Sequence, residues 1–298
     1  MISYAECSAR ERLARLLDAG SFHEWLPPAE RLTSPHLGQL GVPSAFDDGI
    51  AVGRAQLGGK TVFVAAQEGG FMGGGVGEVH GAKLVGLMHR ALRDRPVGVL
   101  LLAESGGVRL HEANAGLIAV SEVMRAVLDV RAAGIPVVVL IGGANGCFGG
   151  MGIVARCADQ VIMSDVGRLA MSGPEVIEAS NGVDEYDARD RALVWRTSGG
   201  KHRWLTGDCD ALVDDDVSAF RVAAIAAMGL PRPISLQSLE AEHAWLAMRL
   251  AAVPEATWND GQQDDAVRLW QHLGVDCAEQ IPAMDTAALR ELVIKRGG

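Results

Sequence analysis

The chain has 298 residues, of which 49% are hydrophobic and 21% charged, enough for one large core but too few for two full catalytic domains. Acidic residues outnumber basic ones by 37 to 27, giving a formal net charge of -10. We therefore expect no nucleic-acid or membrane partner. The five cysteines contain no C-x-x-C pair, and charges run through the N-terminal segment, so the sequence predicts a cytoplasmic protein with reduced thiols.

The N-terminal segment is expected to form an arm with one helix. Leucines at helical spacing within residues 10–17 predict that helix, and Gly20 marks its end. Two short β-type runs follow within residues 50–66. They are joined at Gly58-Gly59, which has the composition of a tight hairpin turn.

From residue 61 to residue 163 one pattern repeats: a short β-branched strand, a glycine-rich turn and an amphipathic helix. The strands are TVFVAA, VGVLLLAE, VVVLIGG and QVIM, and the helices begin near Gly77, Ala113 and Gly149. Continuous apolar strands that alternate with helices predict an α/β fold whose strands are buried on both faces. One stripe at helical spacing is expected to be core packing: Leu117, Val120, Met124, Val127 and Leu128.

After about Asp214 the sequence changes to helical segments that contain alanine, leucine and tryptophan and are broken by prolines. These segments are expected to be peripheral helices. The predicted organisation is an N-terminal arm at 1–45, a main domain at 46–230 and a helical C-terminal extension at 231–298, which could serve a partner interface.

Three strand-to-helix turns are unusually rich in glycine: EGGFMGGGVG at 68–77, ESGGVR at 104–109 and GGANGCFGGMG at 142–152. Glycine lets backbone N–H groups approach a ligand closely, and the helix that follows presents free N–H donors. A single glycine pair after a strand is more often a plain turn. Three such turns in succession favour a site for an anion or a developing oxyanion.

Other catalytic motifs are absent from the sequence. There is no G-x-x-x-x-G-K-[ST], and residues 75–81 have one residue too many for the dinucleotide fingerprint. Neither G-x-S-x-G nor H-E-x-x-H occurs. We therefore expect no ATP or NAD site, no hydrolytic nucleophile and no metal site.

Two interpretations of Arg109 stay open. Its guanidinium could bind a phosphate or carboxylate of a ligand, or it could pair with a structural carboxylate such as Glu104 or Glu112. Cys147 and Cys157 are expected to be packing residues rather than nucleophiles.

The helix that begins near Gly77 carries Glu78, His80 and Lys83 in its first turns. An ordinary solvated face is the favoured interpretation of these three, ahead of a catalytic role. His111 and Asn114 are kept as candidate site-lining residues.

Several segments resemble the carboxyltransferase subunits of biotin-dependent acyl-CoA carboxylases. They are ERLARLLDAGSFHE at residue 11, the stretch from Asp48 to the first glycine turn, ESGGVRLHEANAG with Val108 in place of alanine, GCFGGMGIVARCADQVIM, and LAMSGPEVIEASNG. Without C-x-x-C the chain lacks the zinc ribbon of the bacterial acetyl-CoA carboxylase β subunit, and its length holds one crotonase domain rather than the two of propionyl-type chains. With PPAERLTSPHLGQLG at residue 27, it is most similar to β subunits of biotin-independent malonate decarboxylases.

This resemblance implies a crotonase-like superhelix of ββα units with peripheral N- and C-terminal helices. It also implies conversion of malonyl-S-acyl-carrier-protein to acetyl-S-acyl-carrier-protein and CO2. The implied partners are a γ subunit, the acyl carrier protein subunit and an acyl-carrier transferase subunit. No cofactor would be bound covalently to this chain; the substrate would arrive on the CoA-derived, phosphopantetheine-type arm of the carrier protein.

Oxyanion stabilisation is expected from the backbone amides at Gly106-Gly107 and Gly149-Gly150, without a decision on which oxygen each pair serves. The expected substrate-binding residues are Gly73, Gly74, Gly75, Val108, Arg109, His111 and Met151. The proton donor to the carbanion stays open between His111, a γ-subunit residue and water. A biotin-dependent carboxyltransferase subunit and a non-catalytic scaffold are the alternatives.

Overall fold

The computed structural model describes residues 1–41, 46–251 and 265–292. Its centre is a seven-stranded sheet in which every strand lies beside the next strand in sequence. The second strand is antiparallel to the first and to the third, and the third to the seventh run parallel. The strands are β1 (His23–Trp25), β2 (Ile50–Leu57), β3 (Lys60–Gln67), β4 (Val99–Ala103), β5 (Val137–Ile141), β6 (Gln160–Ser164) and β7 (Ala211–Val213).

The predicted hairpin is confirmed. β2 and β3 pair along their full length, from Ile50 opposite Gln67 to Leu57 opposite Lys60. Gly58 and Gly59 form the turn with φ values of +58° and +75°. Positive φ at both central residues is the requirement of the tight turns that match the twist of a hairpin.

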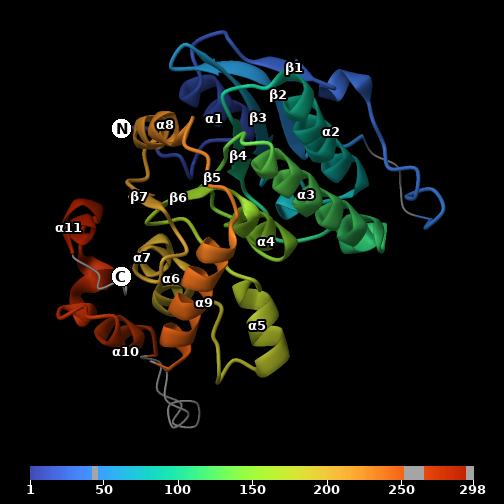
Figure 1. Ribbon diagram of the computed structural model, residues 1–298. Helices are drawn as coiled ribbons and strands as arrows, with labels where there is room; N and C mark the ends of the chain where they lie inside the picture. Colours follow the sequence, from blue (N-terminus) through green and yellow to red (C-terminus); the bar gives the residue numbers. More distant parts are fainter. Residues whose placement is uncertain (42–45, 252–264, 293–298) are drawn as a thin grey trace.

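Helices cover both faces of the sheet (Figure 1). α2 (Glu78–Asp94), α3 (Ala115–Ala132) and α4 (Gly150–Cys157) pack on one face, and α1 (Ala9–Leu16) and α8 (Val217–Ala227) pack on the other. The predicted helix starts near Gly77, Ala113 and Gly149 are therefore confirmed. The predicted α/β fold class is confirmed as well.

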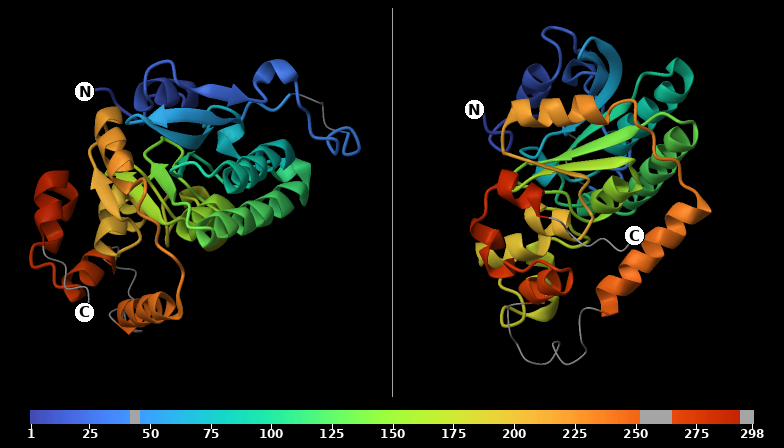
Figure 2. Two further views of the ribbon diagram at one scale, coloured as in Figure 1. Left: turned by 45° about the horizontal axis from the view of Figure 1, so that its top comes forward. Right: turned by 60° about the vertical axis from the view of Figure 1, so that its left-hand side comes forward.

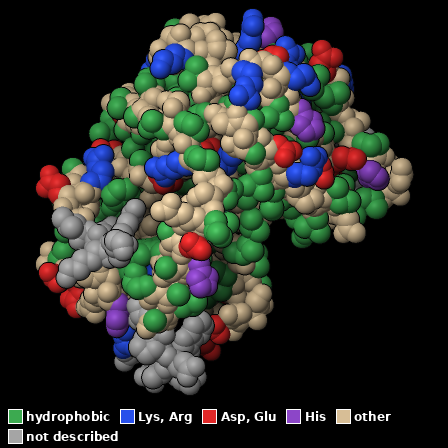
Figure 3. Space-filling model, viewed as in Figure 1, with side chains coloured by type: hydrophobic (Ala, Val, Ile, Leu, Met, Phe, Trp, Pro, Cys, Tyr) green, Lys and Arg blue, Asp and Glu red, His purple; other side chains and the backbone are tan. Residues whose placement is uncertain are grey.

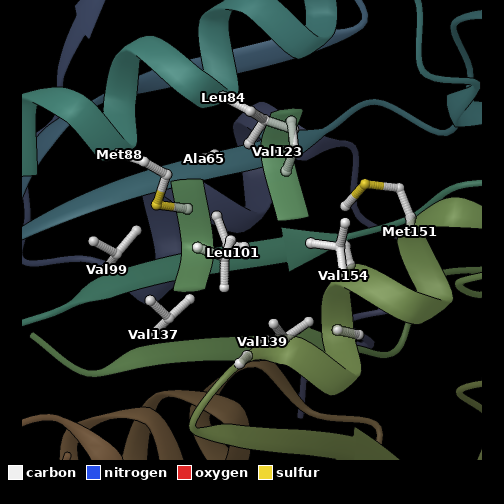
Figure 4. Close-up of a cluster of buried hydrophobic side chains, with 14 of the residues drawn as sticks. Ala65, Leu84, Met88, Val99, Leu101, Val123, Val137, Val139, Met151 and Val154 are labelled. Atoms are coloured by element: carbon white, nitrogen blue, oxygen red, sulfur yellow. The ribbon is translucent and has the colours of Figure 1, made fainter. Parts of the chain in front are cut away.

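Alternation along the strands divides the core into two layers. Val99 and Leu101 of β4 point into the layer below α2, α3 and α4, where Met88 and Val123 meet them (Figure 4). Leu100, between them, points into the opposite layer with α1 and α8. Successive strand residues face opposite sides of a sheet, so apolar residues at every position require cover on both faces.

The expected core stripe on α3 is only partly buried. Val120 and Val127 lie in the core, but the side chain of Leu117 is 57% exposed and that of Leu128 is 38% exposed. At about 100° per residue, these two leucines lie about 120° and 140° around the helix from Val123, the centre of the buried face. The prediction of core packing was wrong for Leu117 and Leu128.

The remaining helices lie beyond the edge of the sheet formed by β6 and β7 (Figure 2). They are α5 (Pro174–Asn181), α6 (Arg191–Ser198), α7 (Gly200–Leu205), α9 (Leu236–Ala251), α10 (Asp265–His272) and α11 (Thr286–Glu291). Short 3-10 turns occur after β1 (η1, Pro28–Glu30), after β3 (η2, Met72–Gly74), after β4 (η3, Leu110–Glu112) and after α10 (η5, Ala278–Ala283). In the described parts of the chain, no helix combines the length and the apolar character needed to cross a bilayer.

The two ends of the chain pack differently. The N-terminal arm belongs to the main body, because β1 pairs with β2 and α1 packs in the core below β3. Residues 265–292 form a third, smaller core with α7 and β7, in which Trp270 and Ile281 are fully buried. The boundaries at residues 45 and 230 stay predictions.

Candidate active site

The three glycine turns meet where the parallel strands have their carboxyl ends. They follow β3, β4 and β5, and the carboxyl ends of parallel strands share an edge. The Gly106 N–H donates to the Gly73 carbonyl oxygen at 2.9 Å, which joins the first turn to the second. The Ser105 N–H donates to the Gly146 carbonyl oxygen at 2.8 Å, which joins the second turn to the third.

Two glycines are required by this geometry. Gly149, the residue before α4, has φ +60° and ψ -136°, a conformation that L-residues rarely adopt. A Cβ atom there would also lie 3.3 Å from the Gly107 Cα. At Gly74, a Cβ would collide with the Glu104 carbonyl oxygen. Glycine therefore permits both the turn conformation and the close approach of the turns.

Two of the four predicted oxyanion donors already have acceptors within the protein. The Gly106 N–H is bonded to Gly73, and the Gly149 N–H donates to the Met171 carbonyl oxygen at 3.0 Å. These bonds hold the turns in place. Donation from Gly106 or Gly149 to a substrate would compete with these bonds, and the catalytic role of both glycine pairs stays a prediction.

Donors with no strong acceptor lie beside them. The Gly107 N–H meets only the Ser105 hydroxyl oxygen, at 3.2 Å. Among the described residues, the N–H groups of Val108, Gly150 and Met151 have no acceptor. The last two open α4, where the helix dipole favours negative charge. The second and third turns thus each present two N–H groups for an oxyanion.

The predicted substrate-binding glycines and Met151 divide into exposed and buried members. Gly73 is exposed, whereas Gly74 and Gly75 are buried under the second turn. The Met151 side chain is 2% exposed and packs in the core (Figure 4), so only its backbone is near the turns. Val108 is half-buried and packs against the same core.

Arg109 makes structural ion pairs. Its side chain is 5% exposed, and it binds both oxygens of Asp47 at 2.5 and 3.1 Å, with Glu112 at 3.3 Å. The guanidinium also donates to the Gly75 carbonyl oxygen at 2.8 Å. Burial would raise the pKa of Asp47, but the hydrogen bonds and charge of Arg109 lower it below its usual value. Of the two candidate partners, Glu112 is observed and Glu104 is not.

Glu104 joins a second buried network. Its carboxylate pairs with Arg12 of α1 and accepts the Asn145 N–H at 3.1 Å, while its own N–H donates to the Gln67 side-chain oxygen at 3.1 Å. Sequence reasoning missed Arg12. The available signal was its position on α1, at helical spacing with the buried Ala9 and Leu16, since a cation on a core-facing position needs a buried partner.

The expected solvated face on α2 is instead largely buried. His80 is completely buried, and desolvation lowers its pKa to about 3, so its imidazole is neutral. Lys83 is buried too, and its Nζ donates to the Ile50 carbonyl oxygen at 3.3 Å. Only Glu78 is half-exposed, where it binds His36 at 2.7 Å. Both His80 and Lys83 face the sheet.

The remaining candidates supply no nucleophile. Cys147 is fully buried, and burial raises the pKa of its thiol to about 12, which confirms it as a packing residue. His111 lies half-buried in η3, beyond Arg109. Over the described ranges no cluster of His, Cys, Asp or Glu could hold a metal ion.

A sheet that advances strand by strand, with glycine turns gathered at its carboxyl edge, defines a carboxyltransferase-type protein of crotonase-like fold. The chain belongs to the carboxyl transferase domain family, whose model matches residues 5–247.

Individual relatives agree with this family. The chain is 39% identical to the malonyl-S-ACP:biotin-protein carboxyltransferase of Malonomonas rubra, over 94% of this chain and 92% of that one. It is also 39% identical to a chain of a Pseudomonas malonate decarboxylase hetero-tetramer crystallised with malonate, with a TM-score of 0.80 over 91% and 97% of the two chains. The 12S subunit of Propionibacterium freudenreichii methylmalonyl-CoA carboxyltransferase is 30% identical, over 77% of this chain and 42% of that protein. The resemblance stated from the sequence is thereby confirmed.

Proposed function

We propose that this chain is the β subunit of a biotin-independent malonate decarboxylase, a carboxy-lyase that converts malonyl-S-acyl-carrier-protein to acetyl-S-acyl-carrier-protein and CO2. The observation that carries the proposal is the pair of neighbouring glycine turns whose N–H groups have no backbone acceptor among the described residues. The similarity to malonate decarboxylase and malonyl-S-ACP carboxyltransferase chains supports the substrate class.

The reaction needs donors rather than a nucleophile. When the bond to the carboxylate carbon breaks, CO2 leaves and the electron pair enters an enolate whose charge lies on the thioester oxygen. Donors that are already in place around that oxygen stabilise the transition state more than the substrate. One such donor is worth about 2.7 to 4 kcal/mol. Protonation of the enolate carbon, by His111, a partner residue or water, then gives the acetyl thioester.

The two donor sets suit the two oxygens of this reaction. One set is formed by Gly107 and Val108, the other by Gly150 and Met151 at the start of α4. In our proposal one set binds the thioester oxygen, on which the enolate charge develops, and the other holds the carboxylate until it leaves as CO2.

A second subunit completes the site in this proposal. Exposed apolar side chains lie next to the second turn and on α3: Met72 is 51% exposed, Leu110 86%, Leu117 57% and Ile118 62%. In Figure 3 hydrophobic side chains gather over α3 and α4, along the hollow that separates them from α5. Contiguous apolar surface of this kind favours a protein partner. The γ subunit is that partner, with the acyl carrier protein and the acyl-carrier transferase as further subunits of the complex.

The Malonomonas relative supports a second candidate. That protein is named as a carboxyltransferase to a biotin protein, and the same turns would stabilise the same enolate while biotin takes the carboxyl group. The two functions share the bond-breaking step and differ in the acceptor.

The test measures CO2 released from malonyl-S-acyl-carrier-protein by this chain alone and with its γ subunit, with and without avidin. Release that requires the second subunit and resists avidin supports the decarboxylase. Release that avidin abolishes, with carboxyl transfer to a biotin protein, would assign the chain to the second candidate. If the thioester loses its carboxyl group in no arm, either as CO2 or by transfer to biotin, both candidate functions are rejected.

A further inference from the structure

A cavity lies beyond the carboxyl end of β6, among α6, α7 and the C-terminal extension. Its volume is about 390 Å³, within the range of small-molecule sites. Asp165 directly follows β6, Arg191 and Arg196 come from α6, and Lys201 comes from α7. The C-terminal extension forms the opposite wall with Trp270. The family model ends at residue 247, so the extension adds this wall to the shared domain.

The basic side chains around this cavity have few carboxylate partners. The side chains of Arg191 and Arg196 form no ion pair or hydrogen bond with any described residue, and the Arg196 Nε is buried without a partner. Within the described ranges, Lys201 donates only to the carbonyl oxygens of Pro282 and Met284, at 3.0 and 2.6 Å. An unpaired buried donor costs free energy, which a bound anion would recover.

The position of Arg191 points the same way. It is the first residue of α6, and a cation at the start of a helix opposes the helix dipole. Asp190 caps the same helix through the Leu193 N–H at 3.0 Å and does not pair with Arg191. Arg191 therefore contributes nothing visible to the stability of α6.

An adjoining cavity extends the basic surface. It shares Val166, Arg191 and Trp195 with the first cavity, adds Arg168 and Arg189, and reaches Gly143 and Ala144 of the third glycine turn. No aspartate or glutamate lines this second cavity. Together the two are lined by five cations and one carboxylate, Asp165, in a chain whose net charge is -10.

Aromatic rings form the apolar part of the first cavity. The Trp195 indole lines it beside the arginines of α6. Trp270 is held in the opposite wall, where its Nε1–H donates to the His202 Nδ1 at 3.2 Å. The Trp195 indole is half-buried and has the Arg168 guanidinium 5.3 Å from its ring centre. An indole next to arginines suits a ligand that joins a flat ring to an anionic group, and the Asp165 carboxylate can accept from a ligand hydroxyl or amino group.

We propose that this cavity binds a ligand of the nucleotide class, with its phosphate on Arg191 and Arg196 and its ring beside Trp195. The ligand is a free nucleotide or the nucleotide end of a CoA molecule, since the two share this chemistry. The inference rests on the cavity alone and not on the reaction at the glycine turns.

Tryptophan fluorescence of the full chain tests the proposal directly. AMP should change the emission in a saturable way, and Trp195→Phe should remove most of that change. Arg191→Ala should weaken AMP binding at least tenfold, in line with loss of a charge-assisted contact. Because Arg191 is exposed and unpaired, this variant should keep the melting temperature of the parent. Arg93→Ala, an exposed arginine on α2, is the matched control and should bind AMP normally.

Three ligand arms separate the outcomes. Inorganic phosphate or adenosine binding as tightly as AMP would overturn the proposal, because only one half of the ligand would then be recognised. An unchanged AMP affinity in Arg191→Ala, or no response to AMP and CoA, would overturn it too. Tighter binding of CoA than of AMP supports it and identifies a CoA-type ligand, and equal or weaker binding of CoA supports it with a free nucleotide. Binding is measured without turnover, so a failed decarboxylase assay leaves this result unaffected.

Discussion

Two buried arginines stabilise the glycine turns through ion pairs and hydrogen bonds. Arg12 pairs with Glu104 after β4, and Arg109 pairs with Asp47 and supports the carbonyl of Gly75. Taking both charges of an ion pair out of water is costly, so such pairs persist only when their hydrogen bonds are complete. A change in either network should therefore reach the turns.

Asp47→Asn is expected to destabilise the chain. It leaves the Arg109 guanidinium buried with only Glu112 as a charged partner, and removal of one member of a buried pair costs about 3 kcal/mol. Urea denaturation measures the loss. Asp129→Asn is the control, because the Arg125–Asp129 pair is exposed and worth less than about 1 kcal/mol. Equal losses in the two variants would contradict the assigned role of the Arg109 network.

Gly149→Ala should remove most of the activity. The backbone at Gly149 has φ +60°, so alanine would distort the turn and move the Gly150 donor away from its position. Loss of one oxyanion donor lowers kcat about 100- to 1,000-fold. Turnover by the complex with the second subunit is the measurement.

Gly59→Ala is the matched control for that variant. Gly59 has φ +75° with open space around it, in the hairpin turn between β2 and β3. Alanine there costs about 1 to 2 kcal/mol of backbone strain without touching the site. If Gly59→Ala lowered kcat as much as Gly149→Ala, general destabilisation rather than the donor would explain the effect.

The sequence predicted the glycine turns but not what supports them. Glycine composition after a strand is a local signal, and it was enough to find all three turns. Arg109 and Asp47 are 62 residues apart, and Arg12 and Glu104 are 92 residues apart. No local pattern links such residues, so their pairing could be learned only from the fold. The same limit hid the bonds that engage Gly106 and Gly149.

At the scale of elements, α3 has one face in the core and one edge without cover. Helical periodicity predicted its start and its buried valines. It did not predict that Leu117 would be exposed, because an apolar residue at the edge of a helix face is buried only if a neighbouring element reaches it. In this chain none of the described elements covers that edge of α3. The proposed γ subunit would cover it.

Ile118→Asp on α3 should block assembly without harming the fold. Ile118 is 62% exposed, so a charge there changes the free energy of unfolding by about 0.5 kcal/mol or less. In an interface, the same charge would be desolvated without a partner and binding would weaken strongly. Calorimetric titration with the γ subunit measures this.

Val222→Asp provides the comparison. Val222 is 69% exposed on α8, on the opposite face of the sheet from α3. It should keep normal affinity for the second subunit. A similar loss of affinity in both variants would exclude α3 as the specific docking surface.

For the whole molecule, the order of elements was predictable and the packing of the C-terminal extension was not. Each strand lies beside the next in sequence, so the repeating pattern of strand, turn and helix translates directly into the sheet. The extension was expected to be peripheral. It forms its own core with α7 and β7, where Trp270 donates to His202. That contact joins residues that are 68 positions apart in the sequence, and the hydrophobic pattern does not predict it.

Stability should fall as the pH drops from 7 to 5, because both buried histidines are neutral in the folded state. Burial lowers the pKa of His80 and of His202 to about 3, whereas an unfolded histidine titrates near 6.5. Between these values the unfolded chain binds more protons, so acidification favours unfolding. Each histidine should cost about 2 kcal/mol over this range. Carboxyl groups with lowered pKa values, such as Asp47, also lose stability on acidification, but mainly below about pH 4, so they add little to the slope between pH 7 and 5.

Urea denaturation at pH 7, 6 and 5 measures this slope, which should total about 4 kcal/mol for the two histidines. His80→Gln and His202→Asn should each remove about half of it. One histidine lies between α2 and the sheet and the other in the core of the extension, so the two variants report on separate parts of the molecule. Stability that stayed constant from pH 7 to pH 5 would mean that neither imidazole is buried and neutral, and a slope unchanged in His202→Asn would mean that the extension does not seal His202 from water.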